Sequence, residues 1–267
     1  MMLYFGSFNP VHNGHTALAE WVVGEGLCDE LVMVVSPQNP HKQNSELAPE
    51  LVRFEMAELA CAASKYPDKI KPSAVEFLLE KPSYTISTLR YLEENFGAQM
   101  EFSILMGTDL VNTLDRWREY ESIVGRYPIY VYPRRGCEVE KFADRIHFLE
   151  GAPMFDFSST EVRRTLQSGG DAGSMVAPAV LGYIRQKGLW SAEGYVRSLE
   201  ERLAANPDDA EALMERGRLH YRRNSWGEAL NDFGRVVVLQ PDNTEARQMR
   251  EMIYEILQFR YTDLYNP

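Results

Sequence analysis

The sequence is poor in cysteine and has no long apolar run. Its three cysteines lie far apart, at Cys28, Cys61 and Cys137, and match no spacing typical of a metal site or a redox pair. We therefore expect reduced thiols in a reducing compartment. No stretch approaches the roughly 18 apolar residues that a membrane-spanning helix needs. The N-terminus has neither the basic and apolar segments nor the cleavage site of a secretion signal, so these absences predict a cytoplasmic protein.

Positive charge is also scarce. The chain of 267 residues carries a net charge of −11, and lysine is absent after Lys187. An acidic surface disfavours non-specific binding to nucleic acid or to anionic lipid, so we expect neither a nucleic-acid nor a membrane partner. The length is sufficient for one large domain followed by a small one.

Short apolar runs alternate with helical patterns over the first 190 residues. The expected strands are Met2–Phe5, Leu31–Val35, Ile70–Val75, Phe102–Met106, Ile129–Tyr132 and Ile146–Phe148. The expected helices are Gly14–Gly24, Leu51–Ser64, Ile86–Asn95, Ser159–Gln167 and Pro178–Gln186. This alternation predicts an α/β fold with a Rossmann-like, doubly wound parallel sheet. Ligands of such sheets bind beyond the carboxyl ends of the strands, so the loops 6–14, 36–42 and 107–117 should form the site.

The pattern changes after Trp190, and we place a domain boundary there, between residues 1–190 and residues 191–267. Ala210–Asn243 spans 34 residues, the period of a tetratricopeptide repeat. Small, aromatic and proline residues stand where that repeat requires them, at Gly217, Tyr221, Ala229, Phe233 and Pro241. The sequence therefore predicts a small all-α, tetratricopeptide-repeat-like domain after the α/β domain.

Further helices are expected on both sides of this repeat, at about Tyr195–Ala205 and Thr244–Leu257. Repeats of this kind normally need about three copies in a stack to bury their apolar faces. One repeat with two flanking helices falls short of that. We therefore expect residues 191–267 to mediate binding of a protein partner or self-association, with the aromatic tail Phe259–Tyr265 suited to such a contact.

The string Gly6–His15 carries the strongest chemical signal. Gly6 allows a ligand to approach the backbone closely at the end of the first expected strand. His12 and His15 are three residues apart where the loop enters a helix, so both imidazoles can face one bound group. The free N–H groups of a helix start favour anions. The string predicts a phosphate cradle, and the plain alternative is a glycine turn with two surface histidines.

A second anion site is predicted at the start of a later helix. Ser158 and Glu161 have the spacing of a capping box. The first-turn N–H groups of Ser159 and Thr160 are then open to a ligand, and Arg163 adds a fork-shaped cation one turn on. By contrast, the pair 134–135, two arginines after the fifth expected strand, is consistent with a plain surface pair.

The His-x-Gly-His pattern within Gly6–His15 is similar to that of the Rossmann-like nucleotidyltransferases, and the whole string resembles the nicotinate-nucleotide adenylyltransferases. Phe5 departs from the family's pattern, in which a second small residue stands before Ser7. The resemblance extends to Val180–Trp190, which is similar to the family's terminal helix. It implies an enzyme that transfers AMP from ATP to nicotinate mononucleotide, giving deamido-NAD and pyrophosphate in NAD biosynthesis. The mononucleotide phosphate attacks the α-phosphorus directly, and Mg²⁺ arrives on the ATP phosphates.

The resemblance also implies roles for individual residues. The implied ATP-binding residues are Gly6, Ser7, Phe8, His12, His15, Gly107, Asp109, Ser159, Thr160 and Arg163, of which His12, His15 and Arg163 are the expected catalytic residues. The implied nicotinate mononucleotide-binding residues are Asn39, His41, Lys42, Tyr84, Thr85 and Trp117. Taken alone, the segment Ser83–Thr85 is merely a good N-cap for a helix that runs to Phe96. No carboxylate cluster resembles a dedicated metal cage, so we expect no metal site built by the protein itself.

Two other functions stay open on the residues alone. The first is a related transferase that uses nicotinamide mononucleotide or phosphopantetheine, although the helix start at Ser83–Thr85 favours a carboxylate over a neutral amide. The second is a nucleotide-binding scaffold that works through the repeat domain. A Rossmann dehydrogenase is disfavoured, because no G-x-G-x-x-G follows an expected strand.

Overall fold

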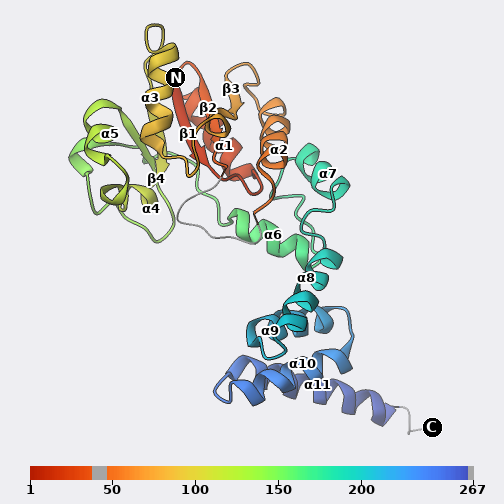
Figure 1. The fold of residues 1–267 in the computed structure, drawn as a ribbon. Helices are drawn as coiled ribbons and strands as arrows, with labels where there is room; N and C mark the ends of the chain where they lie inside the picture. The colour runs from red at the N-terminus through yellow and green to blue at the C-terminus, as the bar shows by residue number, and fades with distance from the viewer. Residues whose placement is uncertain (38–46, 264–267) are drawn as a thin grey trace. The chain divides into compact units, whose positions relative to one another are not determined.

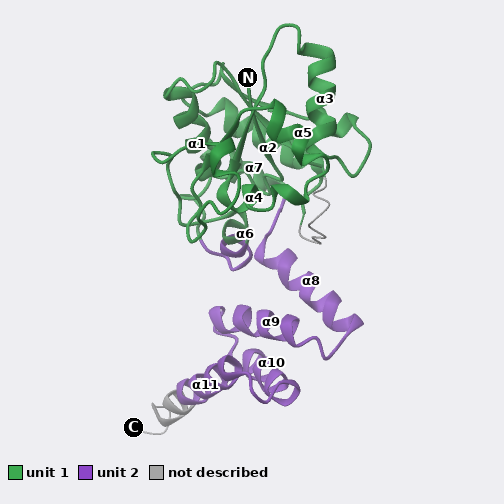
Figure 2. Ribbon diagram, turned by 90° about the vertical axis from the view of Figure 1, so that its left-hand side faces the viewer, with its two compact units in different colours: residues 1–163, 171–187 green, residues 164–170, 188–267 purple. Residues whose placement is uncertain are grey.

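The computed structural model describes residues 1–37 and 47–263, with side chains described as far as residue 257. The chain divides into two compact units. Unit 1 comprises Met1–Arg163 and Asp171–Lys187, and unit 2 comprises Arg164–Gly170 and Gly188–Pro267 (Figure 2). No helix in the described part of the chain is long and apolar enough to cross a membrane.

Unit 1 is built on a six-stranded parallel sheet (Figure 1). The strands are β1 Met2–Gly6, β2 Leu31–Val35, β3 Ile70–Ser73, β4 Ser103–Gly107, β5 Ile129–Tyr132 and β6 His147–Phe148. Their order is β3-β2-β1-β4-β5-β6, so the winding reverses between β1 and β4. The doubly wound parallel sheet predicted from the sequence is confirmed, and its switch point lies beside the loop that follows β1.

Helices cover this sheet, and most were expected. They are α1 Asn13–Gly24, α2 Glu50–Ala62, α3 Thr85–Phe96, α4 Thr108–Val111, α5 Tyr120–Arg126, α6 Ser159–Gln167 and α7 Pro178–Gln186, with short 3-10 turns η1 Val75–Leu78, η2 Leu114–Arg116 and η3 Ala143–Arg145. Helices α1 and α2 contact β2 and β3, whereas α3 contacts α5 and α4 contacts β4 and β5. One apolar cluster joins strands to helices through Leu3, Leu89, Ile104, Ile123 and Ile129.

The sequence reading missed the short helices α4 and α5 and placed the end of β3 too late. Val75 was assigned to the strand, but it begins the 3-10 turn η1 and packs into the apolar cluster. An apolar residue after a strand is compatible with either structure. Helix α5 has seven residues, which is too short to show a clear helical period.

Unit 2 contains the helices α8 Ala192–Ala205, α9 Ala210–Arg222, α10 Trp226–Leu239 and α11 Thr244–Asp263. The 34-residue repeat predicted from the sequence contains the helices α9 and α10. Gly217 of α9 lies against Phe233 of α10, and a Cβ at Gly217 would lie 2.8 Å from the ring. The glycine and the aromatic residue of the repeat pattern thus form one contact that lets the two helices approach closely.

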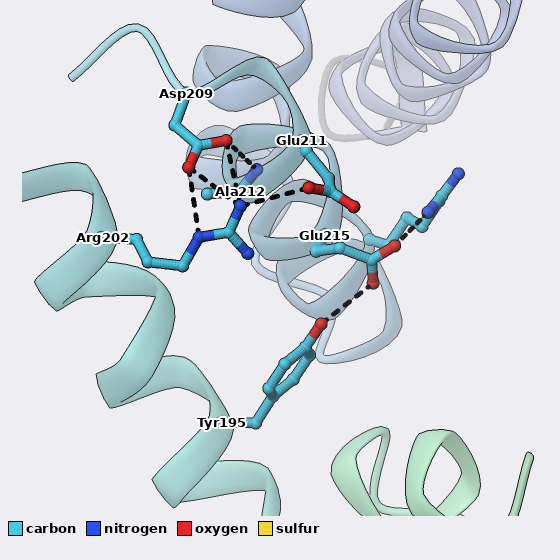
Figure 3. Close-up of polar contacts among 7 residues, drawn as sticks. Tyr195, Arg202, Asp209, Glu211, Ala212 and Glu215 are labelled. Carbon is cyan, nitrogen blue, oxygen red and sulfur yellow. Dashed lines mark hydrogen bonds and ion pairs between the residues drawn. The ribbon is translucent and has the colours of Figure 1, made fainter. Parts of the chain in front are cut away.

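Forked ion pairs connect helices of unit 2: α8 to the start of α9, α9 to α10, and α9 to α11. Arg202 of α8 donates from Nε and Nη2 to Asp209 at 3.1 Å for each nitrogen, and also pairs with Glu211 (Figure 3). Asp209 in turn accepts from the amide of Ala212 and caps α9. Two further guanidiniums bind in the same two-nitrogen way, Arg216 to Asp232 and Arg218 to Glu245. This geometry requires arginine, because an ammonium group cannot form the fork.

Candidate active site

The loop after β1 is folded tightly around its own aromatic residue. Phe8 is only 2 % exposed, and its φ of 44° lies in the left-handed region that non-glycine residues rarely adopt. A Cβ at Gly6 would lie 2.9 Å from the Phe8 ring. Gly6 therefore makes room for the ring of its own loop, a reason for the glycine that the sequence interpretation did not include. Phe8 can offer a ligand its backbone only.

His12 and His15 stand together where this loop enters α1. His12 is the N-cap, and its Nδ1 accepts from the amide of Gly14 at 3.2 Å. The amide of His12 donates to Nδ1 of His15 at 3.1 Å, so the two histidines form a capping box. Their rings are stacked, with centroids 3.6 Å apart and planes 24° from parallel. The two imidazoles therefore lie side by side, and their facing one bound group stays a prediction.

This arrangement sets the protonation of both rings. Each Nδ1 accepts a backbone proton, so a neutral ring must carry its own proton on Nε2. Burial, together with the charge of Arg134, lowers the pKa of His12 to about 4. Burial and the neighbouring His12 lower the pKa of His15 well below its usual value. The pair therefore presents two neutral Nε2–H donors.

A permanent cation faces the same hollow as the histidines. The hollow is lined by residues that include Tyr4, His12, His15, Tyr132, Arg134 and Phe157. Arg134 Nε lies 3.5 Å from Oδ1 of Asp109, and its guanidinium stands 5.5 Å from the centre of the Tyr132 ring. Both arginines are exposed, as the surface reading expects, and both line the hollow. Arg135 pairs with the exposed Asp156, whereas Arg134 pairs with Asp109, a partner that the surface reading does not include. The sequence signal for Arg134 was its position just after β5, the strand next to β4 at the switch point of the sheet.

Gly107 and Asp109 lie at this same edge of the sheet. Gly107 ends β4, and a Cβ there would lie 2.5 Å from Oδ1 of Asp109 and 3.0 Å from Nε of Arg134. The backbone amide of Arg134 also donates to Oγ1 of Thr108 at 3.0 Å. Glycine is thus required for the ends of β4 and β5 to bring a carboxylate and a guanidinium together beside the histidines.

The start of α6 is attached to the β1 loop. The predicted capping box is present: the amide of Ser158 donates to Glu161 at 2.7 Å, and the amide of Glu161 donates to Ser158 Oγ at 3.4 Å. Ser159 Oγ donates to the carbonyl of Pro10 at 2.9 Å. Arg163 is 5 % exposed and donates from Nη1 to the carbonyl of Asn9 at 2.9 Å. Arg163 therefore holds the loop itself, and its contact with a phosphate stays a prediction.

The expected acceptor residues are only partly described. Asn39, His41 and Lys42 lie outside the described residues. Helix α3 begins at Thr85 after Tyr84, whose extended backbone is the N-cap without a side-chain hydrogen bond. Trp117 directly follows η2 as its C-cap and packs against the apolar cluster of unit 1. The first turn of α3 thus lacks a side-chain cap, which leaves it suited to an anion.

The segment Ser83–Thr85 does open α3, with Tyr84 as the N-cap, but the hydroxyl of Ser83 has another partner. That hydroxyl donates to Glu76 Oε2 at 2.9 Å instead of capping α3. Glu76 is a buried carboxyl group that sequence reasoning did not single out, and it also accepts from Thr88 Oγ1 at 3.0 Å. A local serine signal cannot reveal such a partner, because the carboxyl group comes from the preceding 3-10 turn.

Arg53 is the other functional candidate that the sequence reading missed. It is fully buried, and its guanidinium donates to four carbonyls, those of Ser7 and Ser36 at 2.6 Å, Pro37 at 2.7 Å and Ala48 at 2.9 Å. Burial lowers its pKa to about 10. A signal existed: Arg53 occupies the same helical stripe of α2 as the buried Met56, Ala57, Ala60 and Cys61.

The described residues contain no group of three or more histidine, cysteine, aspartate or glutamate side chains placed to hold a metal ion.

Comparison with known proteins covers both units. A model of the cytidylyltransferase-like family matches residues 3–165, and a tetratricopeptide-repeat model matches residues 176–254. The chain is similar to a probable nicotinate-nucleotide adenylyltransferase of Flavobacterium johnsoniae, with 40 % identity over 186 residues that cover 68 % of this chain and 94 % of the relative. A relative of the same description from Bacteroides fragilis is 39 % identical over 188 residues, which cover 69 % and 90 % of the two chains.

Among solved structures, the chain resembles the Plasmodium falciparum nicotinic acid mononucleotide adenylyltransferase complexed with NaAD. The TM-score is 0.59 at 19 % identity, and the match covers 71 % of this chain and 96 % of that one. At this identity the likeness bears on the fold alone, and it agrees with the sheet described above.

The histidine geometry leads to a prediction about protonation. At pH 7 both His12 and His15 should be neutral with the proton on Nε2, and His12 should titrate near its pKa of about 4. An unfolded histidine binds its proton near pH 6.5, so the unfolded chain holds the extra proton between these two values. The stability should therefore fall as the pH drops through that window. Nitrogen-15 NMR of the imidazoles is the measurement, and a charged His12 at pH 7 would refute the assignment.

Proposed function

The chain belongs to the cytidylyltransferase-like family and, within it, to the nicotinate-nucleotide adenylyltransferases, and from this we propose that it transfers AMP from ATP to nicotinate mononucleotide. The products are deamido-NAD and pyrophosphate, in a step of NAD biosynthesis. The observation that carries the proposal is the pair of Nε2–H donors beside Arg134, at the switch point of the sheet.

The reaction needs alignment more than proton transfer. A phosphate oxygen of the mononucleotide forms a bond to the α-phosphorus of ATP, and the bond from that phosphorus to the β-phosphate oxygen breaks. The nucleophile is already ionised at pH 7, so no general base is required. The protein must bring two anions together and offset the charge that develops on the α-phosphate.

The histidines and Arg134 divide this task in our scheme. His12 and His15 donate hydrogen bonds from Nε2 to the α- and β-phosphates but bring no net charge while they are neutral. Arg134 supplies a fixed positive charge beside them, held in place by Asp109 and Tyr132. A bound phosphate also raises the pKa of a nearby imidazole, so the pair can become more cationic once ATP has bound.

The remaining ATP contacts are proposed from the family. They comprise Gly6, Ser7, the backbone of Phe8, Gly107, Ser159, Thr160 and Arg163. Mg²⁺ is proposed to bind the phosphates and water, as it commonly does, since no cluster of three metal-ligating side chains is found among the described residues. When bound, it would neutralise charge on the leaving pyrophosphate.

The acceptor is proposed to bind at α3. The first turn of that helix has no side-chain cap, so its amides favour the carboxylate of nicotinate over the neutral amide of nicotinamide. Tyr84 and Thr85 would provide this contact and Trp117 the stacking surface, with Asn39, His41 and Lys42 on the phosphate side. This feature favours nicotinate mononucleotide over the two alternative acceptors.

We expect faster release of pyrophosphate from ATP and Mg²⁺ with nicotinate mononucleotide than with nicotinamide mononucleotide. The reason is the anion preference of the uncapped start of α3. Turnover with each acceptor, including phosphopantetheine, is measured under identical conditions. Equal or faster turnover of the amide would refute acid specificity, and activity with phosphopantetheine alone would refute the proposed reaction.

Replacing His15 or His12 with alanine should lower kcat about 10²- to 10³-fold, the usual loss for one donor that stabilises developing charge. His147→Ala is the matched control, because that histidine is exposed on β6, away from the phosphate loop. Single-turnover kinetics on folded protein provide the measurement. Near-normal turnover of His15→Ala would contradict the assigned role.

We further propose that unit 2 serves assembly or partner binding and not the chemistry. Apolar side chains stay exposed on α10 and α11, among them Val238, Met252 and Tyr254, and such groups are enriched at interfaces. A chain that ends at Trp190 should therefore keep its turnover within about twofold while its mass in solution changes. Light scattering and a turnover assay on both chains test this. Loss of turnover in a shortened chain that still folds and binds ATP would assign unit 2 a part in the active site.

A further inference from the structure

A pair of tyrosines lines the hollow, and the scheme above assigns no role to their hydroxyl protons. Tyr4 lies in β1 and Tyr132 ends β5, the two strands that flank β4 in the sheet. Both side chains line the hollow together with the two histidines and Arg134. The tyrosines are only 4 % and 8 % exposed, so each hydroxyl needs partners within the protein or on a ligand in the hollow.

Aromatic neighbours fix the position of the Tyr4 ring. Its centroid lies 5.5 Å from that of Phe8 and 6.0 Å from those of His15 and Tyr132. Edge contacts of this kind hold a ring from several sides and favour one orientation. The two hydroxyl oxygens therefore have fixed places beside the histidines, and only their protons can turn.

The oxygen of Tyr132 acts as an acceptor. Arg134 Nη2 lies 3.2 Å from Tyr132 Oη and must be the donor, because a guanidinium has no acceptor. Tyr4 Oη lies 3.4 Å from the same oxygen, and either hydroxyl could donate in that pair. Within the described residues, Tyr132 is the hydrogen-bond partner found for the Tyr4 hydroxyl.

Burial decides which of the two hydroxyls donates. If Tyr132 donated, the proton of Tyr4 would have no acceptor in the described part of the chain, and a buried donor without an acceptor is costly. Tyr4 therefore donates to Tyr132, and burial raises the pKa of Tyr4 well above its usual value, so that proton is kept. The oxygen of Tyr132 then accepts twice, and its own proton is directed away from both donors, toward the hollow.

We propose that the Tyr132 hydroxyl donates a hydrogen bond to a phosphate oxygen of ATP beside the two imidazoles, and that Tyr4 is a positioning residue that turns this proton toward the ligand. The inference rests on the proposed function, since it takes the hollow as the place of the ATP phosphates. Hydrogen bonds in a chain polarise one another, so the bond from Arg134 makes the phenol a stronger donor. Tyr132 thus connects the fixed charge to the ligand.

The first test removes the hydroxyl and keeps the ring. For Tyr132→Phe we expect Kd for ATP with Mg²⁺, and Kd for inorganic pyrophosphate, to rise roughly tenfold, the effect of one lost hydrogen bond to a charged group. Isothermal titration calorimetry on the folded full chain is the measurement. Unchanged Kd values for Tyr132→Phe would overturn the proposal.

Tyr130→Phe is the matched control. Tyr130 belongs to the same strand, and its ring stacks on that of His147 and is not among the groups that line the hollow. Removal of its hydroxyl should leave both Kd values within about twofold of the wild type, as expected for a site with no shared partner. A tenfold loss in this control as well would assign the effect to the strand and overturn the proposal.

A cycle with Arg134 separates direct donation from support of the guanidinium. If Tyr132 only held Arg134 in place, its hydroxyl would have no effect once Arg134 is replaced by alanine. We expect Tyr132→Phe to weaken ATP binding by a further fivefold or so in the Arg134→Ala background, because the hydroxyl has its own contact with the phosphate. No further loss in that background would overturn the proposed contact.

A second cycle tests the role of Tyr4. Tyr4→Phe leaves the oxygen of Tyr132 and its bond to Arg134 in place and releases only the proton. We expect ATP binding to weaken about two- to fivefold, and this loss should vanish in the Tyr132→Phe background, because Tyr4 acts through Tyr132. Equal losses in both backgrounds, or a lower Tm with an unchanged Kd, would refute the positioning role.

The outcome can be told apart from that of the proposed function. A wild-type chain that binds ATP and shows the Tyr132→Phe effect, but does not turn over nicotinate mononucleotide, would refute the reaction and support the phosphate contact. Turnover of nicotinate mononucleotide with no effect of Tyr132→Phe on ATP binding would refute the contact and leave the reaction in place. A wild-type chain that binds neither ATP nor pyrophosphate would overturn both.

Discussion

The architecture of the proposed site depends on buried guanidiniums that bind backbone carbonyls. Arg53 takes the carbonyl of Ser7 and Arg163 takes that of Asn9, so two cations hold the same short loop from different sides. A loop that must turn its amides toward a ligand leaves its carbonyls pointing inward, where unpaired ones are costly. The two arginines satisfy them. They also gather α2, α6 and the ends of β1 and β2 around one position, which the aligned strands alone would not do.

The histidine pair illustrates how local hydrogen bonds determine chemistry. A histidine at the N-cap that accepts from the helix amides must keep its Nδ1 unprotonated, and burial disfavours a second proton. The imidazole is then a neutral Nε2–H donor that faces the hollow. The fixed charge comes from Arg134, which is held in turn by Asp109. The histidines thus supply oriented hydrogen-bond donors and Arg134 supplies the positive charge. Because different residues supply them, both properties are present even when no nucleotide is bound.

Much of the fold could be predicted from the sequence, and the missing parts have a common cause. The alternation of strands and helices, the histidine string, the Ser158–Glu161 capping box and the 34-residue repeat are all local patterns. Arg53, Glu76 and the true partner of Ser83 are not local: each depends on groups that the chain brings together only after the sheet has formed. Arg134 looked like an ordinary surface cation because its neighbours in the sequence carry no sign of the carboxylate that β4 places beside it. The short helix α5 was missed because seven residues display too little periodicity.

The forked arginine pairs of unit 2 have a consequence for covalent chemistry. Unit 2 contains arginine but no lysine, so it has no primary amine side chain, and every lysine of the chain lies in unit 1. Acyl donors and other amine-directed reagents can therefore label the nucleotide-binding unit while the side chains of the helical unit stay unmodified. Acylation of lysines, whether enzymatic or spontaneous, would alter the charge of one unit and leave that of the other intact.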